Sequence, residues 1–470
     1  MKKMISTLLA LCSIFGLCAC GGTSTPKSTD PSTHPQAPVL KAGYGRENIS
    51  PDFPVGMRGY SDSETRKTGA VLDNIYTTCV AFSDGAQTIL LYTIDMCAMS
   101  EEWIGKIREY VSAFIDIPGE NIYIGVTHTH SAPDVNEETQ WDTMLLNGCL
   151  NAAQSAIADL APIQLETATA TLENMNFVRH YLMNDGTYYG SNFGSMESGF
   201  KAHAIEYPDR QLILLKLNRE DKQDILMVNW QAHPAAAARQ SEYNGISADF
   251  IGHTRAKLEN ETGMAIAYYT GALGNINPRS LIESENTNNN ESYIEYGKTL
   301  ADKIIATLPN LTPVENGGIQ TTKLSYEAKI DHSWDHLLTE ANEVYDIWKT
   351  VSKKEGDKLA VKYGMSSVYH ANAIRNRAKL PESEMRELSA FRVGPIGFAA
   401  LTYQMFSDNA EYVKQNSPFD ITFILSSNWD YIGNKSSFEY RSYETDISNI
   451  AAGTGEILAE EYAKLLNSLE

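Results

Sequence analysis

Cysteine is scarce in this chain, and its few copies do not suggest pairing. Of the 6 cysteines among 470 residues, half lie in the first twenty positions, and the others are Cys79, Cys97 and Cys149. Such an odd and widely spaced set does not build the disulfide framework that small secreted domains use. We therefore expect a fold that is stabilised by its own hydrophobic core.

Basic residues and long apolar runs are also few. The chain has 38 lysines and arginines against 59 aspartates and glutamates, which gives a formal net charge of −21. Because phosphate would be repelled, this charge predicts no nucleic-acid partner. Beyond residue 20, no apolar run reaches the roughly 20 residues that a membrane-spanning helix needs.

Three common catalytic motifs are missing as well. The sequence contains no Gly-x-Ser-x-Gly, so a lipase-type triad has no obvious nucleophile. It also lacks a Walker-type phosphate loop and a His-Glu-x-x-His helix. Any hydrolytic chemistry must therefore come from another arrangement of side chains.

The first residues have the pattern of a bacterial export signal. Lys2 and Lys3 precede an apolar run, and the run ends at Leu17-Cys18-Ala19-Cys20. We interpret residues 1–20 as a signal peptide. Its last four residues resemble the lipobox of bacterial lipoproteins, which implies export across the inner membrane and a lipid anchor on Cys20 at the cell envelope. Ordinary cleavage without a lipid is the alternative.

A flexible linker and one large domain follow. Residues 21–38 are rich in Ser, Thr and Pro and have no hydrophobic pattern, which is typical of a tether. Residues 39–470 alternate between apolar β-branched runs and helical patterns, so we expect an α/β domain with mixed sheets. The strands are predicted within 70–85, 88–95, 121–127, 210–218, 223–232, 264–272, 391–403 and 419–427, and the helices within 101–115, 142–160, 292–308, 335–364 and 455–469.

The segment THTHSAPD contains the first candidate site residues, His128 and His130. At the end of a strand, residues i and i+2 point to the same face, so both imidazoles could enter one pocket. Neutral imidazole nitrogen is a good zinc ligand, and a His-x-His pair at a strand end is consistent with a metal site. Two surface histidines in a loop are the other interpretation.

Further polar residues follow other predicted strands. His233 comes after residues 223–232 and is fixed by Pro234. Asp249 precedes a helical pattern and is a candidate site residue, with a helix cap as the alternative. Asn275 and Asn277 follow the strand within 264–272, where the neighbouring glycines would permit either close ligand approach or a plain turn. Six other histidines have no partner pattern, and we expect them on the surface: His180, His203, His253, His332, His336 and His370.

The order of the motifs resembles that in one known family. The segments AGYGRENISP, GMRGY, IDMCAMS, THTHSAPD, NWQAHPAA, ISADFIG, GALGNINP and NWDYIG follow one another as in the catalytic domain of neutral/alkaline (non-lysosomal) ceramidases, over most of residues 41–450. The resemblance implies mixed β-sheets flanked by helices, and a zinc amidase that cleaves the N-acyl bond of ceramide. Many members also have a C-terminal immunoglobulin-like domain, for which this chain has no room.

The resemblance also implies roles for individual residues. His128 and His233 correspond to zinc ligands, and His130 to a substrate or proton-transfer residue beside the metal. Arg179 resembles an arginine that faces the active site. Tyr431 resembles a tyrosine near the metal, either as a ligand or as a hydrogen-bond donor, although a second tyrosine of the family pattern falls on Asn434.

Other positions depart from the family. Gln404 stands where a glutamate is a zinc ligand, so we expect this metal position to bind more weakly. Asn275 replaces an aspartate, and Asn277 replaces a hydroxyl residue that would be a candidate nucleophile. We assign Asn275, Asn277 and Asp249 to substrate binding.

These patterns favour a zinc-dependent hydrolase. We expect metal-activated water to cleave the N-acyl amide of ceramide or of a related amphiphilic lipid, at a membrane reached through Cys20. Two alternatives stay open. The chain could be a surface lipoprotein that binds a sphingolipid-like ligand without cleaving it, or an amidase for another N-acyl substrate.

Overall fold

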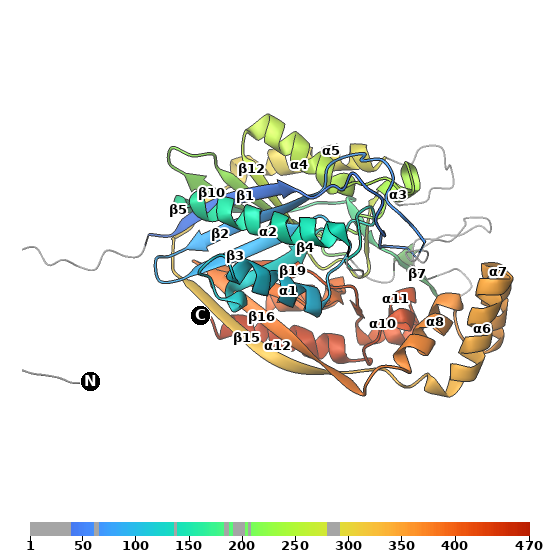
Figure 1. Cartoon of the computed structure of the whole chain (residues 1–470). Helices are drawn as coiled ribbons and strands as arrows, with labels where there is room; N and C mark the ends of the chain where they lie inside the picture. Colours follow the sequence, from blue (N-terminus) through green and yellow to red (C-terminus); the bar gives the residue numbers. More distant parts are fainter. Residues whose placement is uncertain are drawn as a thin grey trace, which may run out of the picture. The chain divides into compact units, whose positions relative to one another are not determined.

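The expected strands belong to two packed sheets in the computed structural model of the chain (Figure 1). The structure describes residues 39–60, 65–135, 139–182, 188–190, 203–204, 208–279 and 292–470. The predicted signal peptide, linker and lipidated Cys20 lie outside these residues and stay predictions. The residues from Pro38 to Glu470 form one compact unit.

The larger sheet has nine strands in the order β12-β11-β10-β5-β1-β2-β3-β4, with β14 paired to β5. Its two parallel pairs are β3–β4 and β11–β12, and the other neighbours are antiparallel. The strands are β1 (Lys41–Asn48), β2 (Tyr76–Ser83), β3 (Thr88–Ile94), β4 (Ile122–Val126), β5 (Ala161–Thr171), β10 (Gln211–Arg219), β11 (Ile225–Trp230), β12 (Ala265–Thr270) and β14 (Thr312–Pro313).

Helices cover one face of this sheet. α1 (Glu101–Ser112) and α2 (Gln140–Ala158) pack against β1 to β4, and α4 (Asp249–Thr262) and α5 (Tyr293–Thr307) pack against β10 to β12. α2 lies so close to β1 that a Cβ at Gly43 would be 2.0 Å from the carbonyl oxygen of Ala156. A larger residue at that position would push the helix off the sheet.

The smaller sheet packs on the other face of the large one. Its order is β15 (Ile319–Lys329), β16 (Ser383–Val393), β17 (Ile396–Leu401) and β19 (Ile421–Ser426), and the pair β17–β19 is parallel. Aromatic rings fill the space between the sheets, with Phe391 and Phe398 stacked at 4.5 Å between ring centroids. α9 (Ser407–Gln415) and α12 (Thr454–Asn467) cover the outer face, which gives a helix–sheet–sheet–helix order of layers.

The predicted long helical segment at 335–364 is divided. It forms α6 (Leu338–Thr350) and α7 (Lys353–Lys362), and α8 (Val368–Arg377) follows, with a small apolar core of their own. The break lies at Ser352, whose side chain accepts a hydrogen bond from the N–H of Glu355 and so caps α7. A cap residue inside an apolar helical pattern thus starts a new helix.

Short elements join the strand exits on which the predicted site residues lie. β6 pairs with β13, β18 pairs with β20, and β7 pairs with β8 and β9. Their bounds are β6 (Asn176–Val178), β7 (His180–Leu182), β8 (Tyr188–Gly190), β9 (His203–Ala204), β13 (Ile276–Pro278), β18 (Gln404–Met405) and β20 (Tyr431–Ile432), and the short helices are α3 (Ala237–Gln240), α10 (Lys435–Tyr440) and α11 (Tyr443–Ile447). Single 3₁₀ turns cover Gly119–Asn121, Leu308–Asn310 and Asp335–Leu337.

The prediction of an α/β fold with mixed sheets flanked by helices is confirmed. Each predicted strand and helix range overlaps an observed element, whereas β1, β5, β14 and β15 of the two main sheets were not predicted. In the part of the chain that the structure describes, no helix combines the length and the apolar character needed to cross a bilayer.

Candidate metal site

The His-x-His pair lies just beyond a strand and not within it. β4 ends at Val126, and His128 takes a left-handed backbone conformation with φ of 69°. The prediction that alternation along a strand aligns the two histidines is therefore wrong, because both lie beyond the strand. The turn at His128 brings its ring centroid to 5.4 Å from that of His130. Left-handed backbone is uncommon for a residue with a side chain, and it often marks a functional site.

Backbone hydrogen bonds bring His233 to the same place. The N–H of His130 donates to the carbonyl of Pro234 at 3.0 Å, and the N–H of His233 donates to the carbonyl of Ile276 at 3.0 Å. The Nε2 atoms of His130 and His233 are 3.0 Å apart. The ring centroid of His128 is 4.6 Å from that of His233. Three histidines from two strand exits therefore form one cluster.

The cluster is buried, and its imidazoles are neutral. The exposed fractions of His128, His130 and His233 are 0%, 8% and 1%. Burial, together with the charge of Arg179 and then of Arg58, lowers the pKa of His128 to about 3. Burial also lowers the pKa values of His130 and His233 well below their ordinary value. Neutral imidazole is the form that binds a metal.

His128 has unsatisfied hydrogen-bonding groups. Neither its Nδ1 nor its Nε2 has a hydrogen-bond partner among the described residues, and the same holds for Nδ1 of His130. Buried polar groups are normally paired, so unpartnered nitrogens inside this cluster call for a ligand. This is the observation that best fits a metal ion.

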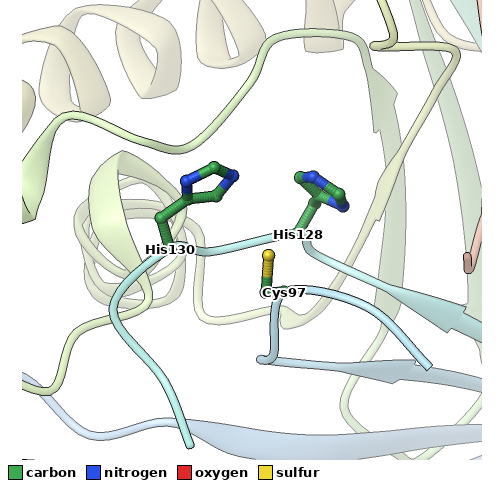
Figure 2. Close-up of side chains that lie close together, drawn as sticks. All are labelled: Cys97, His128 and His130. Carbon is green, nitrogen blue, oxygen red and sulfur yellow. The ribbon is translucent and has the colours of Figure 1, made fainter. Parts of the chain in front are cut away.

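Cys97 also belongs to the cluster, although it was not predicted as a site residue. It follows β3, is completely buried, and is not in a disulfide. Its Sγ and one nitrogen each of His128 and His130 all lie within 4.8 Å of one another. Figure 2 shows the sulfur directed toward the side on which the two imidazoles lie. Burial raises the pKa of the thiol.

The donor types suit a metal such as zinc. Nitrogen and sulfur ligands are those that zinc prefers, and a site with an open position is catalytic in other enzymes. The Nε2 atoms of His130 and His233 lie 3.0 Å apart, which places His130 directly beside a nitrogen of the predicted ligand His233. The cluster therefore fits a metal, and the identity of the ion stays a prediction.

Arg179 holds the surrounding segments together. Its guanidinium donates to Glu444 Oε1 at 2.5 Å, to the carbonyl of Gly274 at 2.9 Å, and to the hydroxyl of Tyr431 at 3.1 Å. Its Nη1 lies 3.4 Å from Nδ1 of His233. The predicted catalytic arginine is therefore beside the cluster, although its donors are occupied by protein groups.

Glu444 was not singled out from the sequence. Burial opposes ionisation of its carboxyl, but Arg179 and His180 outweigh burial and hold its pKa at about 2. Its second oxygen accepts from Nε2 of His180 at 2.7 Å. Glu444 lies in the segment FEYRSYE, which contains a second glutamate and two tyrosines. Nothing in this local sequence distinguishes a buried structural carboxylate from an exposed one.

Gln404 and Tyr431 face each other across the β18–β20 pair. Both are buried. Nε2 of Gln404 donates to the carbonyl of Trp429, and its Oε1 has no partner among the residues described. The hydroxyl of Tyr431 accepts from Arg179. Their assignments as metal positions stay predictions.

The residues that we assigned to substrate binding contact the protein itself. The carboxylate of Asp249 accepts from the N–H groups of Ala236 and Ala237 at 2.8 and 2.6 Å, and so fixes the loop after His233. Burial raises the pKa of Asp249 to about 6. The backbone carbonyl of Asn275 accepts from the N–H of Arg179, and its side-chain Oδ1 accepts from the N–H of Ser407. Both contacts would let these residues position the site.

Two other asparagines have distinct surroundings. Oδ1 of Asn277 accepts from Nη1 of Arg179 at 3.3 Å, and its Nδ2 has no partner within the described ranges. Asn434 accepts from the N–H of Ser437 at 3.0 Å and is the N-cap of α10, which gives a structural reason for asparagine there. The proposed substrate role of Asn277 stays a prediction.

The expectation of surface positions is wrong for two of the six remaining histidines. His180 is fully buried, and its two nitrogens contact Tyr440 and Glu444. His370 is also fully buried, and its ring packs edge-on against Trp334 at 4.7 Å. Both histidines are exceptions because distant segments cover them, which local sequence does not reveal. The side chain of His203 lies outside the described residues.

The fold is similar to that of solved ceramidase structures. The neutral ceramidase from Pseudomonas aeruginosa superposes with a TM-score of 0.67 at 14% identity, over 92% of this chain and 75% of that chain. A ceramidase complexed with C2 gives a TM-score of 0.66 at 14% identity, over 92% and 76%. No protein-family model and no curated protein matches the chain. The predicted neutral-ceramidase-like fold is confirmed.

Proposed function

We propose that the chain is a zinc-dependent amidohydrolase that cleaves the N-acyl bond of ceramide or of a related N-acyl lipid. The main support is the buried cluster of neutral histidines with unpartnered nitrogens, in a fold similar to that of ceramidases. Hydrolysis adds water across the amide and yields a carboxylic acid and an amine.

In this proposal His128 and His233 hold the metal. The chemistry that a bound zinc ion supplies is activation of water near neutral pH and polarisation of the amide carbonyl. Because burial keeps both imidazoles neutral, their nitrogens are available as ligands without competition from protons.

The neighbouring side chains would transfer a proton and stabilise the charge that develops on the substrate. Nδ1 of His130 has no partner among the residues described, so it is the atom that we expect to take a proton from water and give it to the leaving amine. Arg179, whose Nη1 is 3.4 Å from Nδ1 of His233, and Tyr431, whose hydroxyl contacts Arg179, would stabilise negative charge on the carbonyl oxygen. To do so, Arg179 would exchange one of its present acceptors for the substrate.

The membrane is the proposed location of the substrate. Lipidation of Cys20 would place the domain at the bacterial cell envelope, where an amphiphilic N-acyl lipid is accessible. One acyl chain gives marginal anchoring and several give firm anchoring. Mass spectrometry of the membrane fraction tests this part, since a Cys20→Ser variant should lose the lipid mass and leave the membrane.

Activity measurements test the central part. The purified chain should release fatty acid from an N-acyl-sphingosine, lose this activity with a chelator, and regain it with zinc. His128→Ala should abolish turnover, whereas His336→Ala, at an exposed position, should not. Hydrolysis that survives both chelation and H128A would overturn the proposal. Binding of the lipid without turnover would favour the non-catalytic alternative.

A further inference from the structure

The histidine cluster lacks an obvious source of negative charge. Imidazole binds a metal in its neutral form and so adds no negative charge, and Arg179, a fixed cation, lies 3.4 Å from Nδ1 of His233. A divalent ion placed there would be buried beside a positive charge, which is unfavourable unless a ligand is anionic. An anionic protein ligand would offset this positive charge.

The buried carboxylates nearby already have partners. Glu444 is bound by Arg179 and His180, and Asp249 is bound by two backbone N–H groups of the loop after His233. The group of candidate ligand atoms found among the described residues contains a thiol and two histidines, and no carboxylate. The hydroxyl of Tyr431 is occupied by Arg179.

We propose that Cys97 binds the metal as a thiolate, beside His128, and supplies the negative charge that the other ligands lack. This inference depends on the metal site of the proposed function and adds a ligand to it. Cys97 is completely buried, has no disulfide partner, and lies with its Sγ within 4.8 Å of nitrogens of His128 and His130. The thiol proton passes to solvent when the sulfur–metal bond forms.

The sheet fixes this juxtaposition. β3 and β4 are parallel neighbours, and their last residues, Ile94 and Val126, are paired in register. Cys97 is three residues beyond the end of β3, and His128 is two residues beyond the end of β4. The two side chains therefore meet at one edge of the sheet because adjacent parallel strands end together there.

A thiolate ligand has consequences for metal choice. Sulfur donors favour soft or borderline ions, so the site should select Zn²⁺ or Co²⁺ over Mg²⁺ and Ca²⁺. With Cys97, His128 and His233 as ligands, one tetrahedral position would stay open for water or substrate.

Optical and X-ray spectroscopy of the full chain test the ligand directly. Loaded with Co²⁺ alone, the protein should show a sulfur-to-cobalt charge-transfer band, and Cys97→Ser should lose it. Cys149→Ser is the matched control, because Cys149 is equally buried but lies in α2. Loss of the thiolate should weaken metal binding at least as much as the roughly 10–100-fold that loss of an outer-shell partner causes.

The outcomes separate this inference from the proposed function. In the zinc-loaded wild type, X-ray absorption should show a sulfur at about 2.3 Å, a test that needs no variant. Cobalt or zinc bound with only nitrogen and oxygen neighbours, and with equal affinity in C97S, would overturn the thiolate and leave the hydrolase proposal standing. Failure of the wild type to bind either ion would overturn both.

Discussion

The buried ion pair between Arg179 and Glu444 allows a quantitative prediction about the framework around the cluster. The side chains are only 4% and 0% exposed, and Nε of Arg179 lies 2.5 Å from Oε1 of Glu444. We expect Glu444→Gln to destabilise the fold strongly, because the substitution leaves the guanidinium buried without its counter-charge.

Two estimates of the magnitude agree. The pKa of Glu444 falls from its ordinary value of 4.5 to about 2 in the fold. At about 1.4 kcal/mol per pKa unit, this difference corresponds to about 3 kcal/mol of stability at neutral pH. Removal of one partner from a buried ion pair typically costs about 3–5 kcal/mol. We therefore expect E444Q to lower the free energy of unfolding by about 3–4 kcal/mol.

The pH dependence of this loss identifies its cause. A carboxyl with a lowered pKa in the fold stabilises it fully above pH 4.5, and this contribution disappears as the pH falls toward 2. The difference between wild type and E444Q should therefore shrink from about 3 kcal/mol at pH 7 to about 1 kcal/mol at pH 3.

Urea unfolding of both proteins across this range measures the effect. Glu439→Gln is the matched control, since it removes the same charge from an exposed position in α10 and should change stability by less than about 0.5 kcal/mol. If E444Q and E439Q unfold alike at pH 7, or if the loss in E444Q is the same at pH 3, the reasoning is wrong.

Three other substitutions give sharp expectations. Asp249→Ala should cost about 1–3 kcal/mol, since it leaves two buried N–H groups of the loop after His233 without an acceptor, and thermal unfolding would show it. Gly59→Ala should weaken zinc binding measured by calorimetry, because φ at Gly59 is +116° and a Cβ there would lie 2.7 Å from Cβ of His130; unchanged affinity would contradict this. Gln404→Glu should destabilise the metal-free protein by about 1–3 kcal/mol, because the donor to the Trp429 carbonyl is lost, and recovery on adding zinc would show that position 404 reaches the metal.

Much of the layered fold follows from local patterns in the sequence. α1 illustrates why: Ser100 caps it, Glu101 and Glu102 lie in its first turn, and its buried residues recur at helical spacing. β15 was not predicted because most of its residues are at least partly exposed, so that it lacks a long apolar run. Strand prediction from hydrophobicity is weakest for such edge strands.

The candidate site was predictable only in part. His128, His130 and His233 were found from their positions after strands and from a family resemblance, and the structure brings them together. Cys97 and Glu444 were missed, because their roles depend on which strand exits and helices become neighbours in space. Spacing along the chain does not encode that adjacency for single residues.

Metal content of the purified full chain tests the central claim most directly. Elemental analysis after zinc loading and dialysis should give about one zinc per chain, as expected for a single catalytic site. His128→Ala combined with His233→Ala should lose this zinc, whereas the control His332→Ala combined with His336→Ala should retain it. Absence of zinc from the wild type, or the same zinc content in the H128A/H233A variant, would contradict a metal site at this cluster.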